Sequence, residues 1–410
     1  MKMIIRERYL KKIRPYYESD LIKVITGIRR CGKSIILSQI KDEIGKAVSE
    51  NNIIFIDLES VKDRKIDSCD KLEDKISSVI SGSQKYYIFI DEIQNIKDFE
   101  IALASIRNSF NCSVFVTGSN SKLLNGKLQD KLTGRAKEFE IFPFTFMEYL
   151  EFKRINNEEI NEDDDFLDYL ELGGMPQRFL ENGKTETRKY LNGIYTSIIK
   201  KDVFHGHQKI NKNEFQKVSN YVISTTGTPF SSLGAVKQLQ HGITNEEAKK
   251  KSATVINYLG YLVECYLITE CKPHYMKGKE HFNGTKKYYC MDVGIRNALG
   301  TIFDYDNTFA LEGIIYNELL VRGYDVRYVK LRDGEIDFAV INNDKKCFIQ
   351  VAYYMESEKT LEREYSAFQK IKDSSPKFVL SLDKKDTSRN GITHLNVVDF
   401  LTNKTDIFFS

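Results

Sequence analysis

The chain has 410 residues, which is too long for one hydrophobic core and predicts two to four domains. Its composition, 41% hydrophobic and 29% charged, is that of a soluble globular protein, and no run approaches the ~20 apolar residues of a membrane span. The net charge of +3 excludes a strong overall field for nucleic acid, so any basic patch must be local.

The cysteine pattern and the first residues indicate a reducing compartment. Seven cysteines are scattered along the chain without a Cys-x-x-Cys pair, as expected for free thiols. The opening stretch, MKMIIRERYLKKIR, contains no apolar run of signal-peptide length. We therefore expect a cytoplasmic protein that does not enter a membrane.

The first predicted elements are a strand, a glycine-rich loop and a helix. Residues 21–27 form a β-branched apolar run that predicts a buried parallel strand, and residues 33–44 have apolar side chains at helical spacing. The sequence between them matches the phosphate-binding pattern G-x-x-x-x-G-K-[ST] in its required strand–loop–helix setting. The residues predicted to contact ATP here are Gly27, Ile28, Arg29, Arg30, Cys31, Gly32, Lys33, Ser34 and Ile35.

Each part of this loop suits a triphosphate. The glycines allow backbone N–H groups to curl around a phosphate, and the helix N-terminus adds unpaired N–H groups and partial positive charge. Lys33 can reach the β- and γ-phosphates, and Ser34 can place its hydroxyl on Mg²⁺. The alternative is a chance glycine loop.

Residues 85–94, KYYIFIDEIQ, predict a second strand that ends in two acids. Asp91 would hold Mg²⁺, mostly through water, and would lie beside the phosphate-binding loop if the two strands are neighbours. Glu92 is the better candidate to orient and activate the attacking water. The pair favours hydrolysis over binding alone, and the alternative is an acidic strand end that begins a loop.

Three more apolar runs predict strands, at residues 52–58, 112–120 and 137–142, and a helix is predicted at 99–110. Alternating strands and helices predict an α/β fold with a parallel sheet that helices cover on both faces. Ligands bind at the carboxyl ends of such strands, where the glycine loop and the acid pair both fall.

Three further polar residues lie near the same predicted edge. Ser119 or Asn120 could sense the γ-phosphate through a hydrogen bond, and Asn120 could equally be a turn residue. Arg135, just before the last strand, could serve a neighbouring subunit as an arginine finger or could form a surface ion pair.

The middle of the chain has a different organisation. The acidic run at 156–166, NNEEINEDDDF, predicts a solvated loop, and we place a domain boundary near residue 145. Residues 213–291 then predict three helices followed by a β-hairpin, which is the plan of a winged helix.

The third of these helices would start at the basic stretch KKKSAT, residues 249–254. A helix that enters a DNA groove presents cations and hydroxyls in this way. The alternative is a protein-contact module with an ordinary surface cluster. The candidate DNA contacts are Lys249, Lys250, Lys251, Ser252, Thr254 and Asn257.

The last hundred residues predict a helix followed by strands that carry acids. Glu312 or Glu318 on the helix and Asp337 on the second strand fit two carboxylates of a metal-dependent nuclease. The third element reads Gln350-Val351-Ala352, where such a nuclease has a carboxylate and a lysine. We therefore predict a nuclease-like fold with an incomplete site and without cleavage activity.

Several of these stretches resemble those of the bacterial and archaeal ATPases of the AAA+ superfamily that carry a C-terminal domain of unknown function with a restriction-endonuclease-like core. The resemblance covers nearly the whole chain. It rests on RERYLKKIRPYYESDLIKVITGIRRCGKS, FIDEIQ, VFVTGSNSKLL, LTGRAKEFEIFPFTFMEYL and GGMPQRFL.

The resemblance implies roles for matching positions. Arg135 matches the position where related initiator-type ATPases carry their finger, and Arg178 lies where a sensor arginine of the lid would come. Arg6 and Tyr9 lie in a segment that would pass near the adenine. The residues that match the two nucleotide motifs are Lys33, Ser34, Asp91 and Glu92.

Together these observations predict four parts: a P-loop AAA+ core at 1–144, a helical lid at 145–205, a winged-helix-like domain at 206–305 and a restriction-endonuclease-like domain at 306–410. The expected function is Mg²⁺-dependent ATP binding and hydrolysis that drives a conformational cycle, on DNA or a protein partner, in a homo-oligomer. The alternatives are an ATP-binding switch with little turnover and a DNA-processing protein with an active nuclease.

Overall fold

The computed structural model describes residues 2–121, 134–207, 209–240, 242–275, 285–300, 307–331 and 334–408. The chain forms two compact units. The N-terminal unit consists of Met3–Pro143 with Glu264–Tyr266, and the C-terminal unit consists of Phe144–Val263 and Leu267–Ser410 with the first two residues. We describe each unit by itself.

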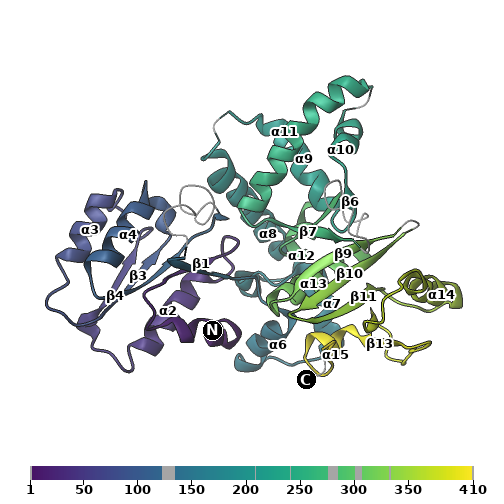
Figure 1. The fold of residues 1–410 in the computed structure, drawn as a ribbon, viewed down its shortest axis with the longest axis horizontal. Helices are drawn as coiled ribbons and strands as arrows, with labels where there is room; N and C mark the ends of the chain where they lie inside the picture. The colour runs from purple at the N-terminus through teal and green to yellow at the C-terminus, as the bar shows by residue number, and fades with distance from the viewer. Residues whose placement is uncertain are drawn as a thin grey trace. The chain divides into compact units, whose positions relative to one another are not determined.

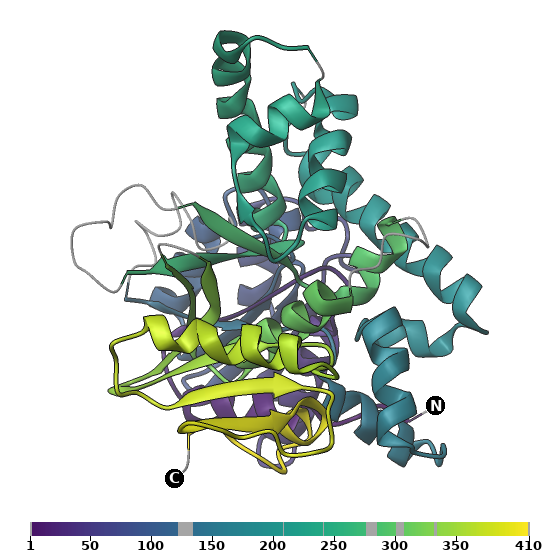
Figure 2. The same ribbon diagram turned by 90° about the vertical axis from the view of Figure 1, so that its right-hand side faces the viewer.

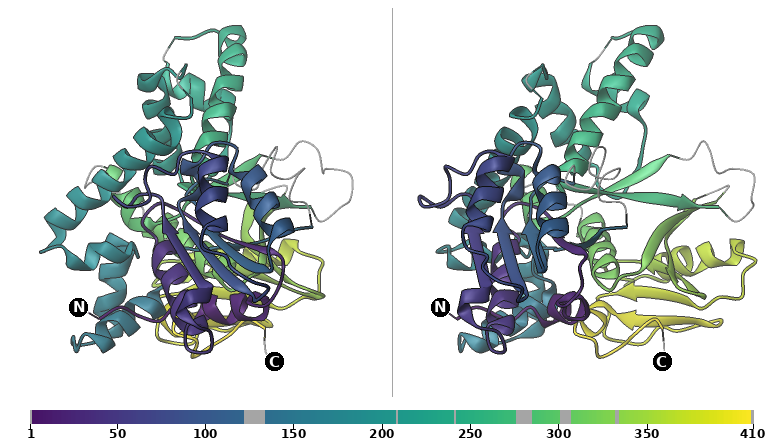
Figure 3. Two further views of the ribbon diagram at one scale, coloured as in Figure 1. Left: turned by 90° about the vertical axis from the view of Figure 1, so that its left-hand side faces the viewer. Right: turned by 60° about the vertical axis from the view of Figure 1, so that its left-hand side comes forward.

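The N-terminal unit is built on a five-stranded sheet in the order β2-β3-β4-β1-β5, and every pair of neighbours is parallel. Figures 1 and 3 show these strands side by side with helices against them. The predicted α/β class with a parallel sheet is confirmed. The strands are β1 (Ile22–Thr26), β2 (Ile53–Asp57), β3 (Tyr86–Asp91), β4 (Cys112–Thr117) and β5 (Ala136–Glu140).

The order of the strands corrects one expectation. The sequence places Asp91 beside the phosphate-binding loop on the condition that β1 and β3 are neighbours, but β4 lies between them. Because all five strands are parallel, the carboxyl ends of β1, β3 and β4 still share one edge of the sheet. A residue of β4 therefore stands between the glycine loop and the acids.

Four α-helices among the described residues accompany this sheet, and the helix after the glycine loop has the predicted bounds. Aliphatic side chains of the strands pack against the last two of these helices in one buried core, which fixes those helices on the sheet. The helices are α1 (Glu7–Ile13), α2 (Lys33–Ile44), α3 (Cys69–Ser77) and α4 (Phe99–Ser109).

The C-terminal unit begins with three helices: α6 (Phe146–Ile155), α7 (Glu162–Leu172) and α8 (Lys184–Ile198). The prediction of a solvated loop over 156–166 is wrong for its second half, because the acids 162–165 form the first turn of α7. Asn161 caps this helix, and negative charge in a first turn is favourable next to the N-terminal end of the helix dipole.

The next segment contains the predicted three helices and hairpin. The third helix begins at Asn245, ahead of the basic residues 249–251, so the expectation that it starts at the basic stretch is wrong. The elements are α9 (Lys212–Ser224), β6 (Pro229–Phe230), α10 (Ser232–Leu239), α11 (Asn245–Glu264), β7 (Ile268–His274) and β8 (Lys286–Cys290).

The hairpin continues into an eight-stranded sheet in the order β13-β12-β11-β10-β9-β7-β8-β6. Strand β7 pairs in parallel with β9, so segments on both sides of residue 306 share one sheet (Figures 1 and 2). The remaining elements are α12 (Val293–Leu299), α13 (Asn307–Val321), β9 (Asp325–Lys330), β10 (Glu335–Asn342), β11 (Lys345–Val351), α14 (Glu358–Ser366), β12 (Lys377–Ser381), β13 (Ile392–Asn396) and α15 (Val397–Leu401).

All seven cysteines lie among the described residues and are free thiols, as the scattered pattern predicts. Over the described ranges, no helix combines the length and the apolar character that a membrane crossing requires.

A buried lysine lies inside β1, toward the end of the strand that is remote from the glycine loop. The Lys23 Nζ atom donates to the Ser113 hydroxyl (2.7 Å) and to the Ser19 carbonyl (3.0 Å), and it lies 4.4 Å from the centre of the Phe115 ring. Burial lowers the pKa of Lys23 to about 7, and the charge of Lys85 acts in the same direction. The folded chain therefore disfavours the charged form of Lys23.

The contribution of Lys23 to the unfolding free energy should rise between pH 7 and about 10, because the unfolded lysine, with a pKa near ~10.4, binds a proton that the folded lysine has already lost. A Lys23→Met variant lacks this dependence. Urea unfolding of both proteins at several pH values in this window measures the difference in their unfolding free energies. The wild type should gain stability relative to the variant as the pH increases. If the unfolding free energies of the two proteins changed in parallel with pH, the conclusion that the buried Lys23 amine is uncharged would be contradicted.

Candidate nucleotide-binding site

The glycine loop connects β1 to α2 and has a backbone path that only glycine adopts readily. Gly27 and Gly32 have φ angles of +137° and +103°. A Cβ atom at Gly27 would lie 2.1 Å from the backbone oxygen of Ile141, so any side chain there would collide with the backbone. The two glycines therefore meet a conformational requirement of this loop.

The two polar residues that follow Gly32 differ in exposure. The Lys33 side chain is buried, and its ammonium donates to the carbonyls of Gly27 (3.0 Å) and Ile28 (3.1 Å). The ammonium thus lies across the loop, at the place where a bound phosphate would need a counter-charge. Ser34 is exposed in the first turn of α2, where its hydroxyl can reach a metal ion.

The acids at the end of β3 are held by a threonine of β4. The Thr117 hydroxyl donates to the Asp91 carboxylate and accepts from the Glu92 N–H (2.9 Å). Glu92 adopts a left-handed φ of +57°, which is uncommon for a residue with a side chain, and the bond from its N–H to Thr117 supports this conformation.

A glutamine joins Glu92 to the end of β4. The Gln94 Nε2 atom donates to the Glu92 carboxylate and to the Ser119 hydroxyl (3.4 Å), while the Gln94 Oε1 atom is buried without a hydrogen-bond partner. The sequence analysis missed both Thr117 and Gln94 as parts of the site. The available signals were a hydroxyl at the carboxyl end of a buried strand and a polar residue two positions after the acid pair.

The other predicted residues of the N-terminal unit lie as follows. Ser119 is buried at the end of β4, and Asn120 follows it and is half-buried. Arg135 is exposed just before β5, and its carbonyl accepts from the Ile22 N–H (2.8 Å). Their proposed roles at the γ-phosphate and in a neighbouring subunit stay predictions.

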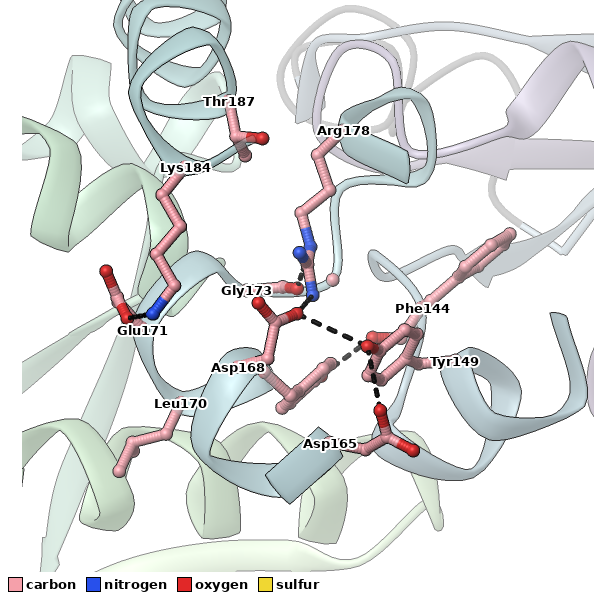
Figure 4. A network of polar contacts seen from close by, with 12 residues as sticks. Phe144, Tyr149, Asp165, Asp168, Leu170, Glu171, Gly173, Arg178, Lys184 and Thr187 are labelled. Carbon is pink, nitrogen blue, oxygen red and sulfur yellow. Dashed lines mark hydrogen bonds and ion pairs between the residues drawn. The ribbon is translucent and has the colours of Figure 1, made fainter. Parts of the chain in front are cut away.

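Arg178 lies in the C-terminal unit, where its guanidinium is buried among aromatic rings (Figure 4). Its Nε atom donates to the Gly173 carbonyl (2.6 Å), and its Nη2 atom donates to Asp168 (3.0 Å). The guanidinium carbon lies 4.2 Å from the centre of the Phe179 ring. These contacts account for the burial of Arg178 within its own unit, and its role as a nucleotide sensor stays a prediction.

The basic cluster Lys249–Lys251 is exposed on α11, and two of its members have neighbours. Lys250 lies 3.5 Å from Glu246, and the Lys251 Nζ atom donates to Gln240 (2.6 Å). Exposed contacts of this kind are weak. The cluster therefore remains able to meet an anionic partner.

The carboxylates of the last domain gather around a lysine that the sequence analysis did not include. The Lys287 Nζ atom of β8 lies 3.2 Å from Glu312 of α13 and 2.7 Å from Glu335 of β10. Asp337 accepts from the Val351 N–H (2.8 Å), and its own N–H donates to the Gln350 side chain (3.4 Å).

The third predicted acid, Glu318, does not join this cluster and pairs with Arg322 instead (2.8 Å). The structure thus brings together Glu312, Asp337 and Gln350, but not Glu318.

The charges of this cluster offset one another only in part, because one ammonium faces three carboxyl groups. Burial raises the pKa of the Asp337 carboxyl well above its usual range, and the charge of Glu312 adds to the effect. Burial opposes the charge on Lys287, but Glu312, Asp337 and Glu335 together raise the pKa of its ammonium. Within the described part of the chain, no group of three His, Cys, Asp or Glu side chains is placed to hold a metal ion. The ammonium of Lys287 occupies the position of a cation between these acids.

Two protein families match separate parts of the chain. The AAA domain family matches residues 19–150, and a family described only as a domain of unknown function (DUF8612) matches residues 163–306. The first match covers β1 to β5 and includes both nucleotide motifs.

Two relatives match over almost the entire chain. An uncharacterized protein of Haemophilus influenzae is 31% identical over 404 residues, which cover 97% of this chain and 98% of the relative. An uncharacterized protein of Methanocaldococcus jannaschii is 31% identical over 389 residues, which cover 91% of this chain and 82% of the relative.

Solved structures give weaker likenesses. The ORC1 protein of Aeropyrum pernix in complex with DNA covers 73% of this chain and 93% of its own, with 13% identity and a TM-score of 0.31. The match to AMPPCP-bound DnaA from Aquifex aeolicus covers 64% of this chain and 90% of the DnaA chain, with 16% identity and a TM-score of 0.30. TM-scores this low do not indicate a shared overall fold.

A Lys287→Met variant should lose about 3–5 kcal/mol of unfolding free energy, because removal of one partner leaves buried carboxylates without their cation. Chemical denaturation measures the loss. Lys286→Met is the matched control, since Lys286 is exposed and pairs with the partly exposed Glu270, and it should change stability by about 0.5 kcal/mol or less. Equal effects of the two variants would show that Lys287 does not balance the cluster.

Proposed function

This chain belongs to the family of AAA-domain proteins that includes the Haemophilus influenzae relative, and on that premise we propose that it binds ATP with Mg²⁺ and hydrolyses it. The observation that carries the proposal is the convergence of a glycine loop, a buried ammonium and an acid pair at one edge of a parallel sheet. Each of these groups suits a different part of a triphosphate.

The residues of the loop would bind the phosphates. The path of the backbone from Gly27 to Gly32 leaves room for phosphate oxygens, and Lys33 would exchange its carbonyl partners for the β- and γ-phosphates. The site fits Mg²⁺, because Ser34 offers an exposed hydroxyl and Asp91 a carboxylate fixed by Thr117. The metal would neutralise charge on the triphosphate.

The remaining groups would act on the water. Glu92 would accept a proton from the attacking water, and Gln94 would hold the Glu92 carboxylate in one orientation through its amide. Exposed Arg135 would complete the site of a neighbouring subunit in a homo-oligomer.

A nucleotide switch with little turnover is the second candidate. It is favoured by the bond from Gln94 to the Glu92 carboxylate, because this bond occupies one carboxylate oxygen and leaves only the other to accept a proton from water. The two candidates bind ATP with the same residues and differ only in the rate of hydrolysis.

We further propose that residues 206–305 act as a winged helix that contacts DNA through Lys249–Lys251, or alternatively a protein partner. The order of three helices and a hairpin, and the exposure of the three lysines, support this proposal. We do not extend the proposal to DNA cleavage, because Ala352 lacks the amine of a nuclease site and Lys287 already neutralises the acids.

A Glu92→Gln variant should release phosphate about 10²–10⁴ times more slowly than the wild type while it still binds ATP, because it loses the proton acceptor but keeps the loop. Steady-state phosphate release and titration with ATP measure the two properties. The control is Glu50→Gln, an exposed glutamate on the same unit. Equal phosphate release by the wild type and Glu92→Gln would favour the switch.

Replacement of Lys249, Lys250 and Lys251 by alanine should flatten the dependence of DNA affinity on salt, by about one unit of slope for each phosphate contact that is lost. The effect is measured by the binding of duplex DNA at salt concentrations from roughly 50 to 200 mM. Replacement of the exposed Lys184 and Lys189 on α8 is the control. An unchanged slope would remove α11 from the interface.

A further inference from the structure

Arg6 is among the largest fully buried side chains of the described residues, with 1% of its surface exposed. It precedes α1, and its guanidinium reaches backbone carbonyls from two distant parts of the N-terminal unit. One nitrogen donates to the carbonyls of Cys31 and Phe142, both at 3.0 Å, and another donates to the Pro143 carbonyl at 3.3 Å. Arg6 therefore joins the glycine loop to residues 141–143, which we call the exit segment because they follow β5 and end the unit.

The exit segment also contacts the glycine loop directly. The Ile141 N–H donates to the Thr26 carbonyl (2.8 Å), and the Cys31 thiol donates to the Ile141 carbonyl (3.2 Å). Burial raises the pKa of Cys31, so the thiol keeps the proton that it donates. The same Ile141 oxygen is the atom that a side chain at Gly27 would strike. Both ends of the loop thus rest against one residue of the exit segment.

Two neighbours fix the position of Arg6. Its guanidinium carbon lies 4.6 Å from the centre of the Tyr9 ring, and the Tyr9 hydroxyl accepts from the Phe142 N–H (3.2 Å). The Gln39 side chain of α2 accepts from the Arg6 N–H (3.2 Å) and donates to the Ile4 carbonyl (2.7 Å). The guanidinium is therefore held between the loop and the exit segment, while α2 fixes the backbone of Arg6.

The geometry of a peptide bond gives this contact a consequence for phosphate binding. In a trans peptide the carbonyl and the next N–H point in opposite directions. Because the Cys31 carbonyl is directed at Arg6, the Gly32 N–H in the same peptide points away from Arg6. Arg6 thus orients a donor that a phosphate in the loop would use.

A planar guanidinium also couples the carbonyls that it binds. Its donors have a fixed geometry, and a carbonyl that moved away would leave a buried charged donor without its partner. A rotation of the Cys31–Gly32 peptide therefore disturbs the bonds to Phe142 and Pro143.

We propose that Arg6 is a positioning residue that orients the Cys31–Gly32 peptide for phosphate binding and transmits the occupancy of the glycine loop to the exit segment. The inference rests on the proposed binding of ATP. It differs from the expectation that Arg6 and Tyr9 contact the adenine, because it assigns Arg6 to the phosphate end of the site.

The test is hydrogen exchange of individual backbone amides in the full chain, with and without Mg²⁺ and a saturating non-hydrolysable ATP analogue. In the wild type, the analogue should slow exchange in the glycine loop and also at the Ile141 and Phe142 amides of the exit segment. In Arg6→Lys, which keeps a cation but loses the planar fork, the analogue should bind about tenfold more weakly. At saturation it should slow exchange in the loop but not in the exit segment.

Arg14→Met is the matched control, because it removes an arginine of the same N-terminal segment that pairs with Glu7 and Glu43 and does not contact the loop. It should behave as the wild type. Tyr9→Phe is a second variant that leaves Arg6 in place and removes the hydroxyl that accepts from the Phe142 N–H. It should reduce the effect of the analogue at Phe142 alone.

The outcomes separate the inference from the proposed function. Slower exchange in the loop of the wild type but not in its exit segment would overturn the inference. The inference would also be overturned if the analogue slowed exchange in the exit segment equally in Arg6→Lys and in the wild type. That result is expected if Arg6 has only a structural role. If the analogue slowed no loop amide in the wild type, the proposed binding of ATP would itself be wrong.

Discussion

The backbone path between β1 and α2 is the constraint on which the rest of the site depends. Gly27 can follow this path only because it has no side chain, since the Ile141 oxygen occupies the space of a Cβ atom. The same close approach places the start of α2, with Lys33 and Ser34, at the carboxyl edge of the sheet. The steric fit of a loop against the segment after β5 thus determines where a phosphate could bind.

The acids are fixed to this edge by a different device. Because β4 separates β1 from β3, Asp91 and Glu92 are held by Thr117 on the intervening strand and not by the loop itself. The uncommon φ of Glu92 and the buried amide of Gln94 show that the acid is held in a specific orientation. Strained backbone supported by hydrogen bonds is typical of functional sites, and its presence here favours chemistry over a simple strand end.

Much of the fold could be predicted from the sequence, but the contacts between distant segments could not. The bounds of α2 follow from apolar residues at helical spacing, and the parallel sheet follows from alternating strands and helices. The order of the strands is not encoded in that alternation, so the place of Thr117 was missed. Lys287 was missed for a similar reason, because it lies on the hairpin strand β8, and the alternation does not show that this hairpin joins the same sheet as β9 and β10. The acids 162–165 were predicted to be a loop since charge alone does not distinguish a solvated turn from the first turn of a helix.

The most direct test of the central claim is calorimetric titration of the full chain with ATP in the presence of Mg²⁺, beside a Lys33→Ala variant. The account predicts saturable binding at one site per chain for the wild type and a large loss of affinity for the variant, because the ammonium that lies across the loop is its main counter-charge. Binding of equal strength by both proteins, or no binding by the wild type, would contradict the account.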